Sequence, residues 1–178
     1  FSYDNSGFVR WAGVFGLLEY KRNNWSAFVN LSSAFSGYKM EDYMKPREVA
    51  LADTTFYVSY GDTINYQNQD YHLNSTEAKD QIIDWVNLPS YTIKLGASYK
   101  IADHSSIFAN TGYLSKAQRF GNVINSNRFG EKLEKFGNYD NEQILAFELG
   151  YTFKSELFSA NINGYYTQWR NKPLDSAP

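Results

Sequence analysis

Residues 144–169, ILAFELGYTFKSELFSANINGYYTQW, contain two alternating runs joined by a short turn. Apolar side chains occupy every second position of both runs: Phe147, Leu149, Tyr151 and Phe153 in the first, and Phe158, Ala160 and Ile162 in the second. A period of two places alternate side chains on opposite faces of a β-sheet. We therefore expect a hairpin with one apolar and one polar face. The apolar face needs a cover, which could be a second protein layer or lipid.

Two further hairpins follow the same pattern, so that hairpins are expected at about 9–38, 89–117 and 144–170. Their turns are short, whereas the connections at about 39–88 and 118–143 are long. Within the first connection, Gly61-Asp62 predicts a small hairpin, and the capping-box spacing of residues 74–77 predicts a helix near 76–86. The fold class expected is all-β, with about six antiparallel up-and-down strands, short turns at one end and long loops at the other.

Composition narrows the class of protein. The 178 residues contain no cysteine, carry a net charge of −2 and are 18% aromatic. The balanced charge gives no field for nucleic acid, and the absence of cysteine excludes disulfides and thiolate metal sites. No apolar run is long enough for a transmembrane helix, but strands of a membrane barrel average out as polar because only alternate residues face lipid. The chain starts without Met, and we expect it to be a segment of a longer protein.

The unequal connections favour lipid over a second protein layer. Outer-membrane barrels have short periplasmic turns and long external loops, whereas sandwiches mix turn lengths at both ends. Aromatic residues also gather at both ends of the expected strands, as in the girdles of such barrels. Six strands are too few to close a membrane-spanning barrel, for which at least about eight are needed. We therefore expect one segment of a larger transmembrane barrel.

The third hairpin, with its approach NEQILAFELGYTFKSELFSANINGYYTQWRNKP, resembles the barrel of TonB-dependent outer-membrane receptors. The matching residues are Glu142, Glu148, Gly150, Tyr151, Ala160, Asn161, Asn163, Tyr165, Tyr166 and Trp169. SIFANTGYLSKAQRF in the second hairpin is similar to a neighbouring family stretch, and the resemblance covers roughly residues 8–38 and 89–173. It implies a barrel of about 22 strands with an internal plug and an energy-coupling motif, neither of which we expect in this chain.

The resemblance also implies location and partners. The chain would lie in the outer membrane of a Gram-negative bacterium, in contact with outer-membrane lipid and with the remainder of the barrel and the plug. A TonB-type energy-coupling protein would act through the missing portion to drive import of a small-molecule, glycan or peptide ligand. Two alternatives remain open: a secreted soluble β-rich carbohydrate-binding module, and a passive porin.

Candidate site residues fall into two sets. Polar residues expected to face the lumen are Lys94, Asn110, Glu148, Asn161 and Asn163, and each could instead be a solvated wall residue. Residues expected to capture ligand from the long loops are Tyr57, Tyr60, Tyr66, Tyr71, Trp85, Arg119 and Arg128. The loop aromatics could equally pack against one another. With only two histidines and no nucleophile–base constellation, we expect no metal site, no cofactor and no enzymatic activity.

Overall fold

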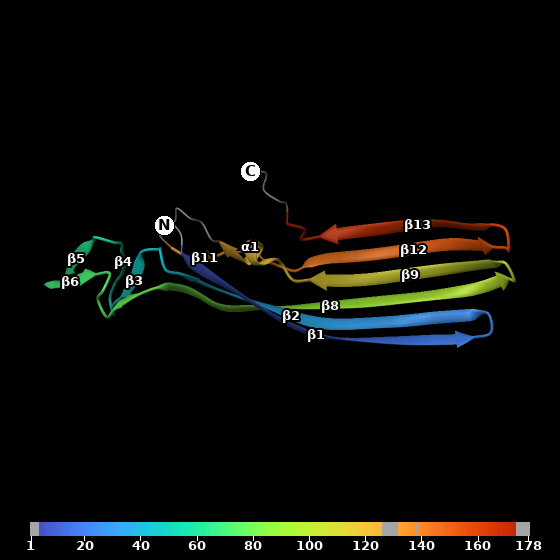
Figure 1. Cartoon of the computed structure of the whole chain (residues 1–178), viewed down its shortest axis with the longest axis horizontal. Helices are drawn as coiled ribbons and strands as arrows, with labels where there is room; N and C mark the ends of the chain where they lie inside the picture. Colours follow the sequence, from blue (N-terminus) through green and yellow to red (C-terminus); the bar gives the residue numbers. More distant parts are fainter. Residues whose placement is uncertain (1–3, 126–131, 138, 174–178) are drawn as a thin grey trace. The chain divides into compact units, whose positions relative to one another are not determined.

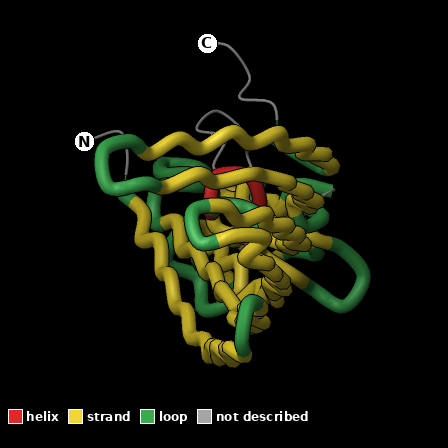
Figure 2. Tube along the Cα trace, turned by 90° about the vertical axis from the view of Figure 1, so that its right-hand side faces the viewer, coloured by secondary structure: helices red, strands yellow, loops and turns green. Residues whose placement is uncertain are grey.

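The computed structural model describes residues 4–125, 132–137 and 139–173. Most of the described residues lie in β-strands of antiparallel sheets, which confirms the expected all-β class (Figure 2). A single helical turn, α1 (Phe120–Val123), is the helix of the described residues and lies between two strands in the chain. The chain forms two compact units, of which unit 1 contains Phe1–Arg10, Gly37–Asn87 and Arg119–Tyr139. Unit 2 contains Trp11–Ser36, Leu88–Gln118 and Asp140–Pro178.

Six strands form the largest sheet, in the order in which they follow one another along the chain (Figure 1). They are β1 (Asn5–Arg22), β2 (Trp25–Asp42), β8 (Gln81–Ala102), β9 (Ser105–Lys116), β12 (Glu142–Lys154) and β13 (Ser159–Arg170). β1 begins at Asn5, before the expected start at about residue 9, and β8 begins well before residue 89. Strands β1 and β13 are the two edges, so the described sheet is open.

The three short turns of this sheet lie at the same end of unit 2 (Figure 1). Asn23 adopts a positive φ of 51° between β1 and β2, a conformation that asparagine tolerates better than most residues. Neighbouring turns are joined through the backbone, since the amide of Lys100 donates to the carbonyl of Asn24 at 2.8 Å and that of Lys154 to the carbonyl of His104 at 2.9 Å. The short turns predicted from the sequence are confirmed.

Unit 1 contains small sheets and a small apolar core. One sheet has the order β4 (Thr55–Val58), β3 (Arg47–Ala50), β7 (Ala78–Lys79), and another pairs β5 (Thr63–Tyr66) with β6 (Gln69–His72). A third pairs β10 (Ile124–Asn125) with β11 (Glu134–Lys135). Val49, Val58, Tyr71 and Ala78 are buried together, and Phe56 and Tyr66 pack against them. These contacts give the connection after β2 a core of its own.

The helix predicted near 76–86 is wrong, because this stretch enters β7 and β8. Residues 72–78 form consecutive turns, in which the amide of Ser75 donates to the carbonyl of His72 and that of Ala78 to the carbonyl of Ser75. Ala78 then pairs with Val49 of β3. The capping-box spacing is a weak local preference, and strand pairing with a distant segment overrides it.

The hairpin predicted around Gly61-Asp62 is also wrong. Gly61 has a φ of 86°, but it joins β4 to β5, and these strands pair with different partners. The hairpin forms instead between β5 and β6, where Gln67 and Asn68 have φ values of 49° and 64°. Two consecutive positive φ values give the turn geometry that fits the twist of a two-residue hairpin.

Candidate functional site

The four strands β8, β9, β12 and β13 of unit 2 place their apolar side chains in rows across one face. In the strand register, one row across the four strands contains Leu95, Thr111, Phe147 and Tyr166. A second row contains Tyr99, Ile107, Tyr151 and Ile162. Leu149 lies between the rows, opposite Ala109 and Gly164. The predicted period of two therefore produces one continuous apolar face, called here the apolar face of unit 2.

The apolar face of unit 2 is open. The exposed fractions of Leu31, Leu95, Leu149 and Ile162 are 50%, 43%, 66% and 73%. A second protein layer packed on this sheet would bury these side chains. Exposed apolar surface of this extent is unusual for a soluble monomer and marks a surface that another apolar phase or molecule covers.

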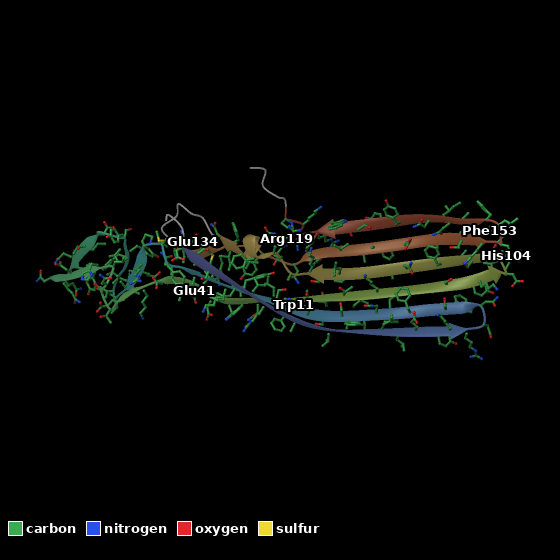
Figure 3. The ribbon with its side chains drawn as sticks, in the orientation of Figure 1. Trp11, Glu41, His104, Arg119, Glu134 and Phe153 are labelled. Atoms are coloured by element: carbon green, nitrogen blue, oxygen red, sulfur yellow. The ribbon has the colours of Figure 1, made fainter. Side chains whose placement is uncertain are left out.

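Aromatic side chains gather near both ends of this face. At the turn end, the ring centroids of Trp25 and Tyr99 are 4.7 Å apart. His104 and Phe153 also meet there, with centroids 6.4 Å apart (Figure 3). At the other end of the same strands, the centroids of Tyr91 and Tyr113 are 5.8 Å apart.

The opposite face of unit 2, called here the polar face, carries a hydrogen-bonded cluster centred on Glu148. The side-chain amide of Asn110 donates to Oε2 of Glu148 at 3.0 Å, and that of Asn163 donates to Oε1 at 2.7 Å. Asn110 lies directly opposite Glu148 on β9, and Asn163 lies on β13 diagonal to it. Three of the residues expected to face a lumen are thus brought together.

The remaining two residues of that set also lie on the polar face. Lys94 lines a hollow of about 460 Å³ together with Asn110 and Glu148. Within the described residues Lys94 forms no ion pair, and its side chain is exposed. Asn161 accepts a long hydrogen bond of 3.4 Å from the hydroxyl of Thr152.

Two phenylalanines on the polar face lie over glycines of the neighbouring strands. A Cβ at Gly96 would overlap the ring of Phe28, and a Cβ at Gly150 would overlap the ring of Phe108. Phe28 interrupts an otherwise polar row in the sequence, and the missing side chain of Gly96 explains how its ring is accommodated. The sequence analysis did not predict this arrangement. The signal for it in the sequence is an aromatic residue on the polar face of one strand and a glycine in the neighbouring strand.

Glu148→Ala should lower the free energy of unfolding, because two side-chain amides lose their acceptor. Glu148→Gln should cost less, since its carbonyl oxygen can accept one of the two bonds. Denaturant titration of the folded protein measures both differences. Equal stability of Glu148→Ala and the unmodified protein would show that the cluster is only a solvated surface.

The predicted loop residues have different surroundings in unit 1. Tyr71 is 6% exposed and its ring lies 5.4 Å from that of Phe56, so little of it can contact a ligand. Tyr66 packs on the same Phe56, and its hydroxyl donates to Asp53 at 2.8 Å. This hydrogen bond to the Asp53 carboxylate raises the pKa of Tyr66. Both rings therefore help to hold the loop core together.

The other predicted loop residues are more accessible. Tyr60 is 93% exposed, and the half-buried Tyr57 donates a long hydrogen bond of 3.4 Å to Glu48. The guanidinium of Arg10 lies 4.1 Å from the ring centre of Trp85, so one face of that ring is already occupied. Arg119 is exposed directly before α1 (Figure 3). Arg128 lies outside the described residues.

A charged group in unit 1 links Lys39 and Glu41 at the end of β2 with Tyr43 just after this strand. Lys39 Nζ lies 2.8 Å from Glu41 Oε1, and the Tyr43 hydroxyl donates to Glu41 Oε2 at 2.6 Å. The hydrogen bond with Lys39 lowers the pKa of Glu41, while Glu41 raises the pKa values of Lys39 and Tyr43. The contribution of Glu41 to stability is thus present above the ordinary glutamate pKa and is lost as pH falls through the lowered one.

No protein-family model matches the sequence, and no curated protein and no solved structure is significantly similar to it. In the part of the chain that the structure describes, no helix is long and apolar enough to cross a membrane. The same residues contain no group of three or more His, Asp or Glu side chains placed to hold a metal ion.

Proposed function

We propose that this chain is a membrane-spanning segment of an outer-membrane receptor of the TonB-dependent type, which imports a nutrient by an energy-coupled mechanism. Unit 2 would supply strands of the barrel wall. Unit 1 would supply structure on the side that meets the ligand. The open apolar face of unit 2 is the observation that carries this proposal.

Lipid is the cover that best fits the apolar face of unit 2. Its rows of Leu, Ile, Phe and Tyr side chains cross four neighbouring strands in register. The aromatic pairs near both ends of the strands fit the two membrane interfaces, where amphipathic rings are enriched. Hydrocarbon would cover Leu149 and Ile162 without requiring a second sheet.

The polar face of unit 2 would then line the interior. Glu148 with its two amide donors, and Lys94 beside the same hollow, are suited to a water-filled space or to a polar plug. Because the unpaired edges of β1 and β13 would be costly in hydrocarbon, further strands must close the wall. The receptor type in particular is supported by the strand residues that resemble TonB-dependent receptors, among them Glu148, Gly150 and Asn163.

Gel mobility in outer-membrane fractions tests membrane insertion. The full protein, extracted in detergent, should migrate faster when unheated than after boiling, because folded barrels resist unfolding by detergent. Its recovery only from soluble fractions without detergent would contradict the proposal and favour a soluble β-rich module.

Deletion of the energy-coupling protein in the same cells tests the receptor type. Nutrient uptake that depends on this protein should be lost in the deletion strain, since the plug would no longer be driven. Uptake that persists unchanged would identify a passive pore instead.

A further inference from the structure

The three-stranded sheet β4-β3-β7 of unit 1 has two faces of different chemistry. Val49 and Ala78 pair across β3 and β7 and point into the small core. The residues that alternate with them lie on the other face, where Glu48 stands opposite Lys79 of β7 and Tyr57 of β4 in the strand register. Glu77 lies in the turn directly before Ala78 and lines the same side of the sheet as Lys79. This second face is charged, and the apolar core formed by the described residues lies on the other side of the sheet.

A hollow of about 510 Å³ lies over this charged face. Its lining includes Glu48, Glu77, Lys79 and Lys132, with Ile82 and Leu133 as the apolar part of the wall. The volume falls within the range of roughly 300–1,000 Å³ that is usual for ligand pockets. None of the aromatic residues predicted to capture ligand lines this hollow. Tyr57 donates a hydrogen bond to Glu48, which does line it.

The wall of this pocket is held in place by hydrogen bonds between distant segments. The buried Gln81 donates to the carbonyl of Pro46 at 2.7 Å and accepts from the amide of Leu133 at 2.6 Å. Arg47 holds Asp80 at 3.0 Å and donates to the carbonyl of Leu73 at 2.9 Å. The pocket is therefore largely formed before a ligand arrives, which lowers the entropic cost of binding.

The charged groups of the pocket remain available to a ligand. Asp80 is paired with Arg47, but Glu48, Glu77, Lys79 and Lys132 take part in no ion pair within the described residues. Two carboxylates and two ammonium groups thus surround one space. A purely anionic ligand would meet the glutamates and a purely cationic one the lysines. Among the described lining residues, a neutral glycan would find no aromatic ring on which to stack.

We infer that this pocket binds a short zwitterionic peptide. The free carboxylate of the peptide would meet Lys79 and Lys132, its free ammonium group would meet Glu48 and Glu77, and an apolar side chain would rest on Ile82 and Leu133. This inference adds a ligand class to the proposed import function. Passage of the bound peptide through the membrane rests on that proposed function. Binding itself does not depend on transport.

Calorimetric titration of the full detergent-solubilised protein with trialanine tests the inference. We expect binding of trialanine with free termini, and at least about tenfold weaker binding of N-acetyl-trialanine amide, because capping removes both charges. Lys79→Gln and Glu77→Gln should each weaken binding of the free peptide by about tenfold. Lys135→Gln, an exposed lysine outside the pocket lining, is the matched control and should bind as the unmodified protein does.

Three results would overturn the inference: no binding of trialanine by the folded protein, equal binding of the free and capped peptides, or equal weakening by Lys79→Gln and Lys135→Gln. Heat-modifiable mobility of each variant shows that it is folded, so loss of binding is attributed to the pocket. A protein that inserts into the membrane but binds no trialanine refutes only the peptide. A soluble protein that binds it refutes only the membrane receptor.

Discussion

Leu149→Arg should prevent stable insertion of the protein into the outer membrane. Leu149 is 66% exposed at the centre of the apolar face, on β12 between Ala109 and Gly164. An arginine facing lipid near the middle of the bilayer costs about 2–4 kcal/mol. The fraction of the protein that shows heat-modifiable mobility in outer-membrane extracts measures this loss.

Asn161→Arg is the matched control for this prediction. Asn161 lies on the polar face of the neighbouring strand and is exposed, and its side chain accepts a long hydrogen bond from Thr152. The same added charge should therefore leave insertion nearly unchanged. If Leu149→Arg inserts as well as Asn161→Arg, the apolar face does not meet lipid and the proposed function fails.

Gly150→Ala should destabilise the sheet by about 1–3 kcal/mol, because its methyl group would occupy the space of the Phe108 ring. Phe108 would have to rotate away from the buried Gly150 and would lose its contact with the neighbouring strand. Denaturant titration in detergent measures the change in the free energy of unfolding. In a Phe108→Ala background the same substitution should cost much less, since the overlap has been removed.

Gly164→Ala provides the comparison on the opposite face. Gly164 lies in β13, the strand next to that of Gly150. No atom of the described residues lies within 4 Å of the Cβ that the substitution would add. We expect a change close to zero, or a slight gain from reduced freedom of the unfolded chain. Equal losses at Gly150 and Gly164 would show that the effect is a general response to replacing strand glycines and does not come from the Phe108 ring.

The strands and faces of unit 2 were predictable because their pattern is local. Alternation in residues 144–169 requires only that neighbouring side chains point to opposite faces, and the register of β12 with β13 preserves it. The short turns were predictable for the same reason. The ends of the strands were harder to predict. β8 begins at Gln81, where the apolar residues stand next to one another and do not alternate with polar ones.

The candidate site was predictable only in part. Residues expected on the polar side of the strands do lie on one face, and Glu148 meets Asn110 and Asn163 there. Among the loop residues, however, nothing in the local sequence distinguishes the buried Tyr71 from the exposed Tyr60. The difference arises because Tyr71 packs with Val49 and Val58, which are distant in the sequence.

The sequence by itself determined the all-β class, the two faces of each long strand and the short turns, since all three depend on residues close together in the chain. Only the tertiary structure decided that residues 76–86 form strand, that Phe28 and Phe108 lie over glycines, and that Glu48, Lys79 and Lys132 surround one pocket. Each of these depends on pairing between distant segments, whose free energy outweighs the weak preferences of the local sequence.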